Sequence, residues 1–260
     1  MIVRTVGETE YQLIRQIDHA AMSAQIARKW RPPEGLSDVA WQLLIEAVEH
    51  HDDGWEQADR NVILGPGGQP LDFNHIPTDR HLEIWQKSVQ LGAERHPYVD
   101  LLISLHARWL YTKFSRQEEP EAVQAWVFDW MEELTGHVDR ALERCAAEGA
   151  DIAAAIEPKM LSQAQRLVSI FDGLSLMLLG AIVVQESTAA LAFGKQTAAL
   201  RLILLKKKLA CWPWPFISAR VKAEVPYCLV TGEQLSDPNA VWEALASPSE
   251  TKLQWTLQPE

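Results

Sequence analysis

Hydrophobic residues recur with a helical period through most of the first 185 residues of this chain. From Arg15 to Trp30 small apolar residues share one face, and Pro32 ends the segment because the residue before a proline is disfavoured in a helix. Further helices are predicted after Ser37 or Asp38, from about Thr78, from Pro97, over 119–147 and, bent or broken near Pro158, over 151–184. This pattern predicts a mainly α fold.

The two ends of the chain have a different pattern. Residues 1–14 hold Gly7 between two short β-prone pieces, which predicts a small hairpin. After about residue 186, short apolar runs alternate with turn signals such as Thr231-Gly232. We therefore expect an N-terminal β segment (1–14), a helical core (15–185) and a small β-rich C-terminal appendage (186–260) that packs on the core.

Residues 56–78 show no regular period and include the turn Gly65-Pro66-Gly67-Gly68. A loop of this length inside a compact domain is often functional. It joins the helix that ends near His51 to the helix that begins near His81, so we expect it to form a wall or lid of a site. The alternative is a connector packed through Leu71, Phe73 and Ile76.

Composition and charge narrow the classes of protein. The formal net charge is −11, which argues against a general nucleic-acid or anionic-membrane binder. The three cysteines are scattered and odd in number, which is typical of reduced thiols, and no signal peptide opens the chain, so a cytoplasmic protein is expected. The longest apolar run carries Asp172, which disfavours a membrane span. A small-molecule substrate is expected, and a homo-oligomer stays open.

Residues that bind divalent metals stand out within these helical segments. They are His19, His51, Asp52, His81, His106 and Asp172. Burying that many polar groups costs several kcal/mol unless something pairs them. A bound metal is one such partner. The ordinary alternatives are a core histidine bonded to a carbonyl for His106, and an exposed first helical turn for His81.

The order of these residues resembles the HD superfamily of metal-dependent enzymes. Its hallmark is a histidine at a helix end followed by aspartate, any residue and glycine, here His51-Asp52-Asp53-Gly54. His19 resembles the first-helix histidine of that superfamily, and Asp172 resembles its closing aspartate on a late helix. The resemblance covers about residues 15–180 and implies an HD-domain-like helical core.

Two more histidines resemble those of two-metal HD proteins, which include cyclic-dinucleotide phosphodiesterases and di-iron oxygenases. The resemblance implies a dinuclear site for Fe, Mn, Zn or Co. One ion would take His19, His51 and Asp172, the other His81 and His106, with Asp52 as the bridge. A carboxylate bridge between two cations suits the binding of an oxygen or a phosphoryl group.

The chain as a whole resembles a bacterial family of unknown function within this superfamily. The residues that carry this resemblance are the start MIVRTVG, Gln16-Ile17-Asp18-His19-Ala20, the turn His51-Asp52-Asp53-Gly54-Trp55, Leu105-His106 and Trp212-Pro213-Trp214-Pro215-Phe216. The sequence also departs from better-known relatives. Trp55 stands where many HD enzymes carry a lysine, and Ala107 follows His106, which disfavours hydrolysis of cyclic dinucleotides.

Around the metal ligands we predict catalytic roles for Asp52 and Asp53, and substrate contacts for Trp55, His75 and Arg108. Each of Asp53, Trp55 and Arg108 has a structural role as its alternative, and His137 is expected on a solvated helix face. Few cations lie near the predicted ligands in the sequence.

Three functions follow from this pattern. The first is a metal-dependent phosphohydrolase of HD type that acts on a small phosphorylated molecule. The second is a di-iron oxygenase of HD type. The third is a non-catalytic protein that binds a metal or a ligand.

Overall fold

The computed structural model describes residues 1–113, 120–182, 190–205, 207–246 and 252–260. Its helices are α1 (Gln16–Ala27), α2 (Asp38–His50), α3 (Trp55–Asp59), α4 (Thr78–Ala93), α5 (Pro97–Lys113), α6 (Glu121–Ala146), α7 (Ala150–Ala155), α8 (Pro158–Leu179) and α9 (Pro238–Ala246), with a 3₁₀ turn η1 (Gln234–Ser236). The boundaries follow local chemistry. Ser37 caps α2 by accepting a hydrogen bond from the backbone N–H of Ala40, and Gly180 ends α8 in the left-handed conformation that favours glycine.

Strands form three sheets in the described part of the chain. Their bounds are β1 (Ile2–Thr5), β2 (Glu10–Ile14), β3 (Ala190–Phe193), β4 (Gln196–Ala199), β5 (Arg201–Leu205), β6 (Lys208–Trp212), β7 (Val221–Pro226), β8 (Cys228–Thr231) and β9 (Lys252–Pro259). The sheet orders are β1-β2-β8, β3-β4 and β5-β6-β9-β7. In the four-stranded sheet β6 and β9 are parallel and the other neighbours are antiparallel.

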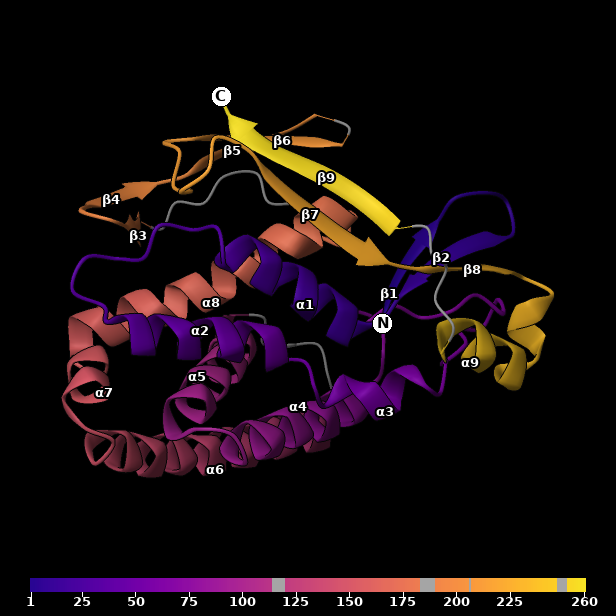
Figure 1. Cartoon of the computed structure of the whole chain (residues 1–260). Coiled ribbons are helices and arrows are strands. Elements are labelled where there is room, and N and C mark those ends of the chain that lie inside the picture. The colour runs from indigo at the N-terminus through magenta and orange to yellow at the C-terminus, as the bar shows by residue number, and fades with distance from the viewer. Residues whose placement is uncertain (114–119, 183–189, 206, 247–251) are drawn as a thin grey trace.

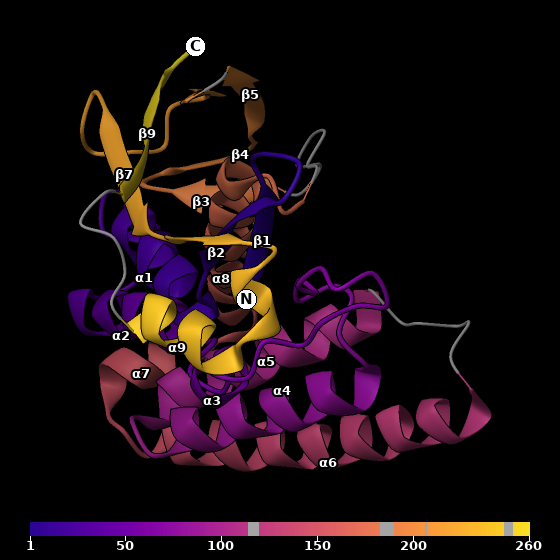
Figure 2. The same ribbon diagram turned by 90° about the vertical axis from the view of Figure 1, so that its right-hand side faces the viewer.

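The helices and sheets form layers. The four-stranded sheet lies over α1 and α8, and α6 lies on the far side of the helical layer (Figure 1). The same order appears in the perpendicular view, where α4 and α5 lie between α6 and the rest of the molecule (Figure 2). Gln25 of α1 ties the helices to the sheet, because its carboxamide exchanges two hydrogen bonds with the backbone of Glu224 in β7.

The expectation of a mainly α fold with a small β-rich appendage is wrong. The protein is mixed α/β, because the described residues are 53% helix and 21% strand around a helical core. Strands from both ends of the chain share one sheet, since β2 pairs with β8 and Leu13 lies opposite Cys228. Short strands such as β4 (Gln196–Ala199) alternate too weakly to be recognised as sheet from their pattern.

The predicted hairpin in residues 1–14 is confirmed as β1 and β2, in which Ile2 pairs with Ile14. The predicted loop over 56–78 is wrong at its start, where α3 continues to Asp59. The division of the chain at residues 14 and 185 stays a prediction, and its second boundary lies outside the described residues.

The late aromatic segment packs on the helical core through Phe216. This ring is buried and lies 5.1 Å from the ring of Trp30, which follows α1. Trp214 is half-buried against Phe216, while Trp212 stays 63% exposed. Phe216 therefore anchors this segment on the core, whereas Trp212 is largely exposed.

Candidate metal centre

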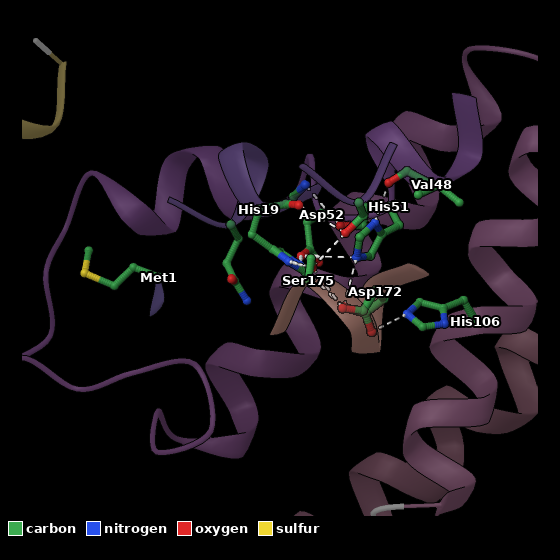
Figure 3. Close-up of polar contacts among 12 residues, drawn as sticks. Met1, His19, Val48, His51, Asp52, His106, Asp172 and Ser175 are labelled. Atoms are coloured by element: carbon green, nitrogen blue, oxygen red, sulfur yellow. Dashed lines mark hydrogen bonds and ion pairs between the residues drawn. The ribbon is translucent and has the colours of Figure 1, made fainter. Parts of the chain in front are cut away.

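Three elements bring four of the predicted ligands to one place. His19 lies on the inner face of α1, His51 and Asp52 directly follow α2, and Asp172 lies within α8. All four side chains are buried, in a region where apolar residues surround them. Figure 3 shows His19, His51, Asp52 and Asp172 pointing toward one another.

The atoms that face one another are two imidazole nitrogens and the oxygens of two carboxylates. Asp52 Oδ2 lies 3.0 Å from His19 Nε2 and 3.3 Å from His51 Nε2. Asp172 Oδ1 lies 3.4 Å from His19 Nε2 and 3.7 Å from His51 Nε2. Ligand atoms of His19, His51 and Asp172 all lie within 4.8 Å of one another.

Hydrogen bonds on the outer side of each imidazole fix which nitrogen faces the centre. His51 Nδ1 lies 2.8 Å from the carbonyl oxygen of Val48, which can only accept, so Nδ1 carries a proton. His19 Nδ1 lies 2.6 Å from Ser175 Oγ, whose own proton is donated to the carbonyl of Asp172. Both Nε2 atoms therefore present a lone pair to the centre when the rings are neutral.

The charges in this small space are strongly coupled. Burial alone would lower the pKa of His51, but the charge of Asp52 and the hydrogen bond and charge of Asp172 raise it to about 9. Burial would raise the pKa of Asp172, but hydrogen bonds and charges from His106 and His51 hold it well below its usual range. The carboxylate therefore stays ionised, and the centre favours an added positive charge.

This donor set fits a divalent transition metal. Imidazole nitrogen and carboxylate oxygen bind Fe, Mn, Zn or Co at about 2.0–2.2 Å, which places neighbouring ligand atoms roughly 3–3.5 Å apart. The four distances around the centre run from 3.0 to 3.7 Å. Within the described residues, no lysine or arginine is found among the residues that line the cavity at this centre, so a metal ion is the natural counter-charge.

Asp172 also faces a third histidine. Its second oxygen, Oδ2, lies 3.4 Å from His106 Nε2 on the other side of the carboxylate (Figure 3). That nitrogen is buried and makes no hydrogen bond of good geometry with any described residue, while His106 Nδ1 lies 3.2 Å from Ser169 Oγ. Asp172 therefore lies between His106 on one side and His19 and His51 on the other, and the bridging role implied for Asp52 stays a prediction.

The sixth predicted ligand, His81, lies at the edge of this arrangement. It lines the same cavity from α4, and its Nδ1 lies 2.6 Å from the hydroxyl of Tyr111. Its ring is 5.7 Å from that of Trp55 and 6.5 Å from that of Trp85. In the described residues it joins no group of three close ligands, so the dinuclear site stays a prediction.

Three of the other predicted site residues lie outside the cavity lining. Asp53 pairs with His50 and with Arg95, and these partners hold the pKa of its carboxyl below the usual range although burial opposes this. The side chain of His75 is 70% exposed, and its Nδ1 lies 2.7 Å from Asp72 Oδ1. Arg108 is half-buried on α5.

Trp55 is placed as predicted, since it is buried and lines the cavity together with Phe73 and Asn74 from the following loop. The loop therefore supplies part of the wall, as the sequence predicted. It also encloses an apolar cluster of Trp55, Ile76 and Ile84, with Phe73 and Leu71 packed against it. Both roles weighed for this loop are present, and Phe73 takes part in both.

Gly54 of the motif has a steric role. Its φ of −61° is open to any residue, but a Cβ would lie well inside van der Waals contact of the Ile84 carbonyl and 2.7 Å from the backbone nitrogen of Ser88. Its own N–H donates to Ser88 Oγ at 3.0 Å. Glycine thus lets α4 approach the turn that carries His51 and Asp52, and α4 supplies one wall of the cavity.

Sequence reasoning missed the residues that orient the ligands. Ser175 contacts His19, and Ser23 donates to Ser175 Oγ at 2.8 Å. Both serines are fully buried. The available signal was their spacing, because Ser23 follows His19 by four residues and Ser175 follows Asp172 by three, on the same helix faces.

The cavity beside the centre has a volume of about 590 Å³. Helices α4, α5, α6 and α8 supply most of its walls. Aromatic and aliphatic side chains dominate the lining, among them Trp85, Trp109, Val127, Met131 and Leu176. Pockets of this size hold small-molecule ligands.

Comparisons with known proteins identify a family. Residues 1–232 match the family model described as a protein of unknown function (DUF3891), so the chain belongs to this family. No curated protein and no solved structure matches the chain. The predicted likeness to a family of unknown function is confirmed, and membership of the HD superfamily stays a prediction. None of the described helices has the length and apolar character needed to span a bilayer.

Proposed function

We propose that this protein is a metal-dependent hydrolase of HD type that cleaves a phosphoester in a small molecule. The observation that supports it best is the convergence of His19, His51, Asp52 and Asp172 beside a cavity of ligand size. The order of these residues in the chain is that of the HD superfamily. A cytoplasmic location and a small-molecule substrate belong to the same proposal.

A divalent ion at this centre would lower the pKa of a bound water and polarise a substrate oxygen. The chain's own residues prepare that chemistry. Ser175 and the carbonyl of Val48 hold the two imidazoles with Nε2 toward the centre. Asp52 and Asp172 supply the negative charge that retains the cation, and the buried apolar surroundings strengthen that attraction by excluding water.

A di-iron oxygenase is the second candidate, favoured by one observation. His106 Nε2 faces Asp172 Oδ2 at 3.4 Å from the side opposite His19 and His51. A second ion could use this nitrogen. Redox-active iron with consumption of O₂ would mark this reaction, whereas a hydrolase works without O₂.

The test begins with protein purified without added metal. Elemental analysis gives the resident ion, and release of 4-nitrophenol from bis(4-nitrophenyl) phosphate is then followed under anaerobic conditions with Mn²⁺ or Co²⁺. The proposal expects metal-dependent release that Asp52→Ala abolishes. O₂ consumption in place of anaerobic release would support the oxygenase. Bound metal with neither activity, across a panel of esters, would support the third function, a non-catalytic binding protein.

A further inference from the structure

The cavity beside the candidate metal centre has a composition that restricts the substrate. Its volume of about 590 Å³ is large for a phosphate or a short sugar and suits a molecule of drug-like size. The walls away from the centre are mainly apolar, with Trp85 contributed by α4 and Val127 and Met131 by α6. Apolar walls gain free energy only from apolar ligand surface, about 25 cal/mol per Å² removed from water.

The charges that face the cavity also disfavour a highly charged substrate. In the described lining, Asp52 and Asp172 are the acidic residues, and neither lysine nor arginine is present. Two carboxylates offset one divalent cation, so a one-metal centre carries no net formal charge (−2 + 2 = 0). Phosphate-rich ligands are normally held by arginine, lysine or helix N-termini. A group with several negative charges would therefore enter this low-dielectric space without compensation.

Buried polar atoms without partners indicate a small polar end on the ligand. Across the described residues, two buried side-chain atoms of the cavity lining have neither a hydrogen bond nor an ion-pair partner: Gln16 Oε1 and Trp85 Nε1. Each costs roughly 1–3 kcal/mol while it has no partner. A ligand that donates to Gln16 and accepts from Trp85 would offset this cost. These few atoms can bind one small polar group of a ligand. The rest of the cavity wall offers mainly apolar contacts.

We propose that the substrate is an ester with at most one negative charge at the metal end and a bulky aromatic or branched apolar group in the cavity. The inference rests on the proposed hydrolase function. For a phosphodiester, the oxygen of water bonds to phosphorus and the P–O bond to the apolar alcohol breaks. The departing oxygen then takes a proton from that water. The products are a phosphate monoester and an apolar alcohol or phenol.

The outer rim of the cavity offers a residue that tests this without disturbing the fold. Phe128 on α6 lines the cavity and is 61% exposed, so its replacement removes no buried contact of the core. Trp126 lies two residues away on the same helix, is also exposed at 37%, and is not part of the lining. Phe128→Glu and Trp126→Glu therefore introduce the same charge on the same helix, inside and outside the proposed contact.

Binding is measured by calorimetry on the metal-loaded protein, separately from turnover. Diphenyl phosphate carries one negative charge and two aryl groups. Dimethyl phosphate keeps the charge and lacks the bulk, and ATP carries several charges with an aromatic base. We expect diphenyl phosphate to bind at least about tenfold more tightly than either. Phe128→Glu should weaken it about tenfold, consistent with loss of a partly buried aromatic contact and added repulsion. Trp126→Glu should leave it within about twofold.

The outcomes separate the two proposals. Equal or tighter binding of dimethyl phosphate or ATP would overturn the substrate class, whatever the turnover. Equal effects of Phe128→Glu and Trp126→Glu would overturn the placement of the apolar group. Tight, Phe128-dependent binding of diphenyl phosphate with no release of phenol in any metal form would support the ligand class and count against the hydrolase.

Discussion

Asp100 and Asp172 are both buried in the helical core next to histidine, and the two have different surroundings. Asp100 on α5 is fully buried and accepts hydrogen bonds from Ser104 Oγ at 3.2 Å and His137 Nε2 at 2.7 Å, while Arg144 pairs with its other oxygen. None of these residues lines the cavity described above. The Asp100 group is complete, because a guanidinium offsets the charge and each carboxylate oxygen has a partner.

Asp172 on α8 is also buried, but its neighbours are imidazoles whose proton count can change and no described lysine or arginine pairs with it. One of these neighbours, His106 Nε2, lies 3.4 Å from Asp172 Oδ2, and a cavity opens beside the pair. A buried histidine–aspartate contact is therefore not by itself evidence of a metal site. The evidence lies in the absence of a described lysine or arginine beside Asp172, the unpartnered polar atoms of the cavity lining and the space for a ligand.

The largest expected difference between the two groups is in metal binding. Asp172→Ala removes oxygens that face His19, His51 and His106, so we expect loss of essentially all bound transition metal. Changes outside the direct ligands of a metal cost about 10–100-fold in affinity, so loss of a ligand should cost at least about 100-fold. Elemental analysis after dialysis measures this. Asp100→Ala should retain its metal, and equal loss in both variants would contradict the distinction.

Asp100→Ala, which should retain its metal, should instead lower the free energy of unfolding. Asp100→Ala leaves the Arg144 and His137 side chains without their partner, and breaking a buried charge pair costs about 3–5 kcal/mol. We expect about 3 kcal/mol, the lower end, because Arg144 is 44% exposed and water screens it. Urea unfolding of metal-free protein measures the loss. The exposed Asp139 on the same helix as Arg144 supplies the control, since Asp139→Ala should change the free energy of unfolding by less than about 0.5 kcal/mol.

Sequence pattern located the candidate centre better than it located the Asp100 group. His19, His51, Asp52 and Asp172 could be recognised because their order along the chain resembles a known superfamily. Asp100 and Arg144 are 44 residues apart on different helices, with no motif to connect them. His137 was expected to face solvent, and it is only 25% exposed because its Nε2 turns inward to Asp100. Pairing between distant helices depends on packing, which periodicity does not encode.

In the fold, too, the sequence pattern predicted local elements but not the contacts between distant ones. Helices with a strong apolar period, such as α2 and α4, begin close to where their capping residues predict, at Asp38 and Thr78. The pairing of β2 with β8 joins residues more than 200 positions apart, and α9 was not expected at all. Strand pairing over such distances is set by the packed whole, so the local pattern missed the mixed α/β character.

A third prediction concerns the turn next to the centre. Gly54→Ala would force its new methyl group against the backbone of α4, which cannot yield as a flexible side chain would. We expect a loss of about 1–3 kcal/mol in the free energy of unfolding and weaker metal binding, because the turn also carries His51 and Asp52. Gly136→Ala is the matched control. Its Cβ would meet only the end of Arg140 at 3.4 Å, so the helix α6 should gain about 0.5–1 kcal/mol. A gain in both variants would show that α4 can move aside.

Ser175, next to His19, and Ser104, next to Asp100, should differ in their effect on metal affinity. Ser175→Ala removes the hydrogen bond that orients His19, so metal affinity should fall about tenfold while the ligands themselves remain. Ser104→Ala removes the corresponding bond to Asp100 and should cost about 1 kcal/mol of stability with no change in metal affinity. Competition with a metal-binding dye gives the affinities. An unchanged affinity in Ser175→Ala would mean that packing alone holds the His19 ring.

The smallest effect is expected at His75, which the sequence suggested as a substrate contact. Its side chain is 70% exposed, it is not part of the described cavity lining, and its partner is the neighbouring Asp72. An exposed pair of this kind contributes about 0–1 kcal/mol. His75→Ala should therefore leave metal content and the affinity for diphenyl phosphate within about twofold, and lower the free energy of unfolding by less than about 1 kcal/mol. A clear loss of ligand affinity with stability unchanged would instead place this loop over the bound ligand, with His75 turned toward the cavity.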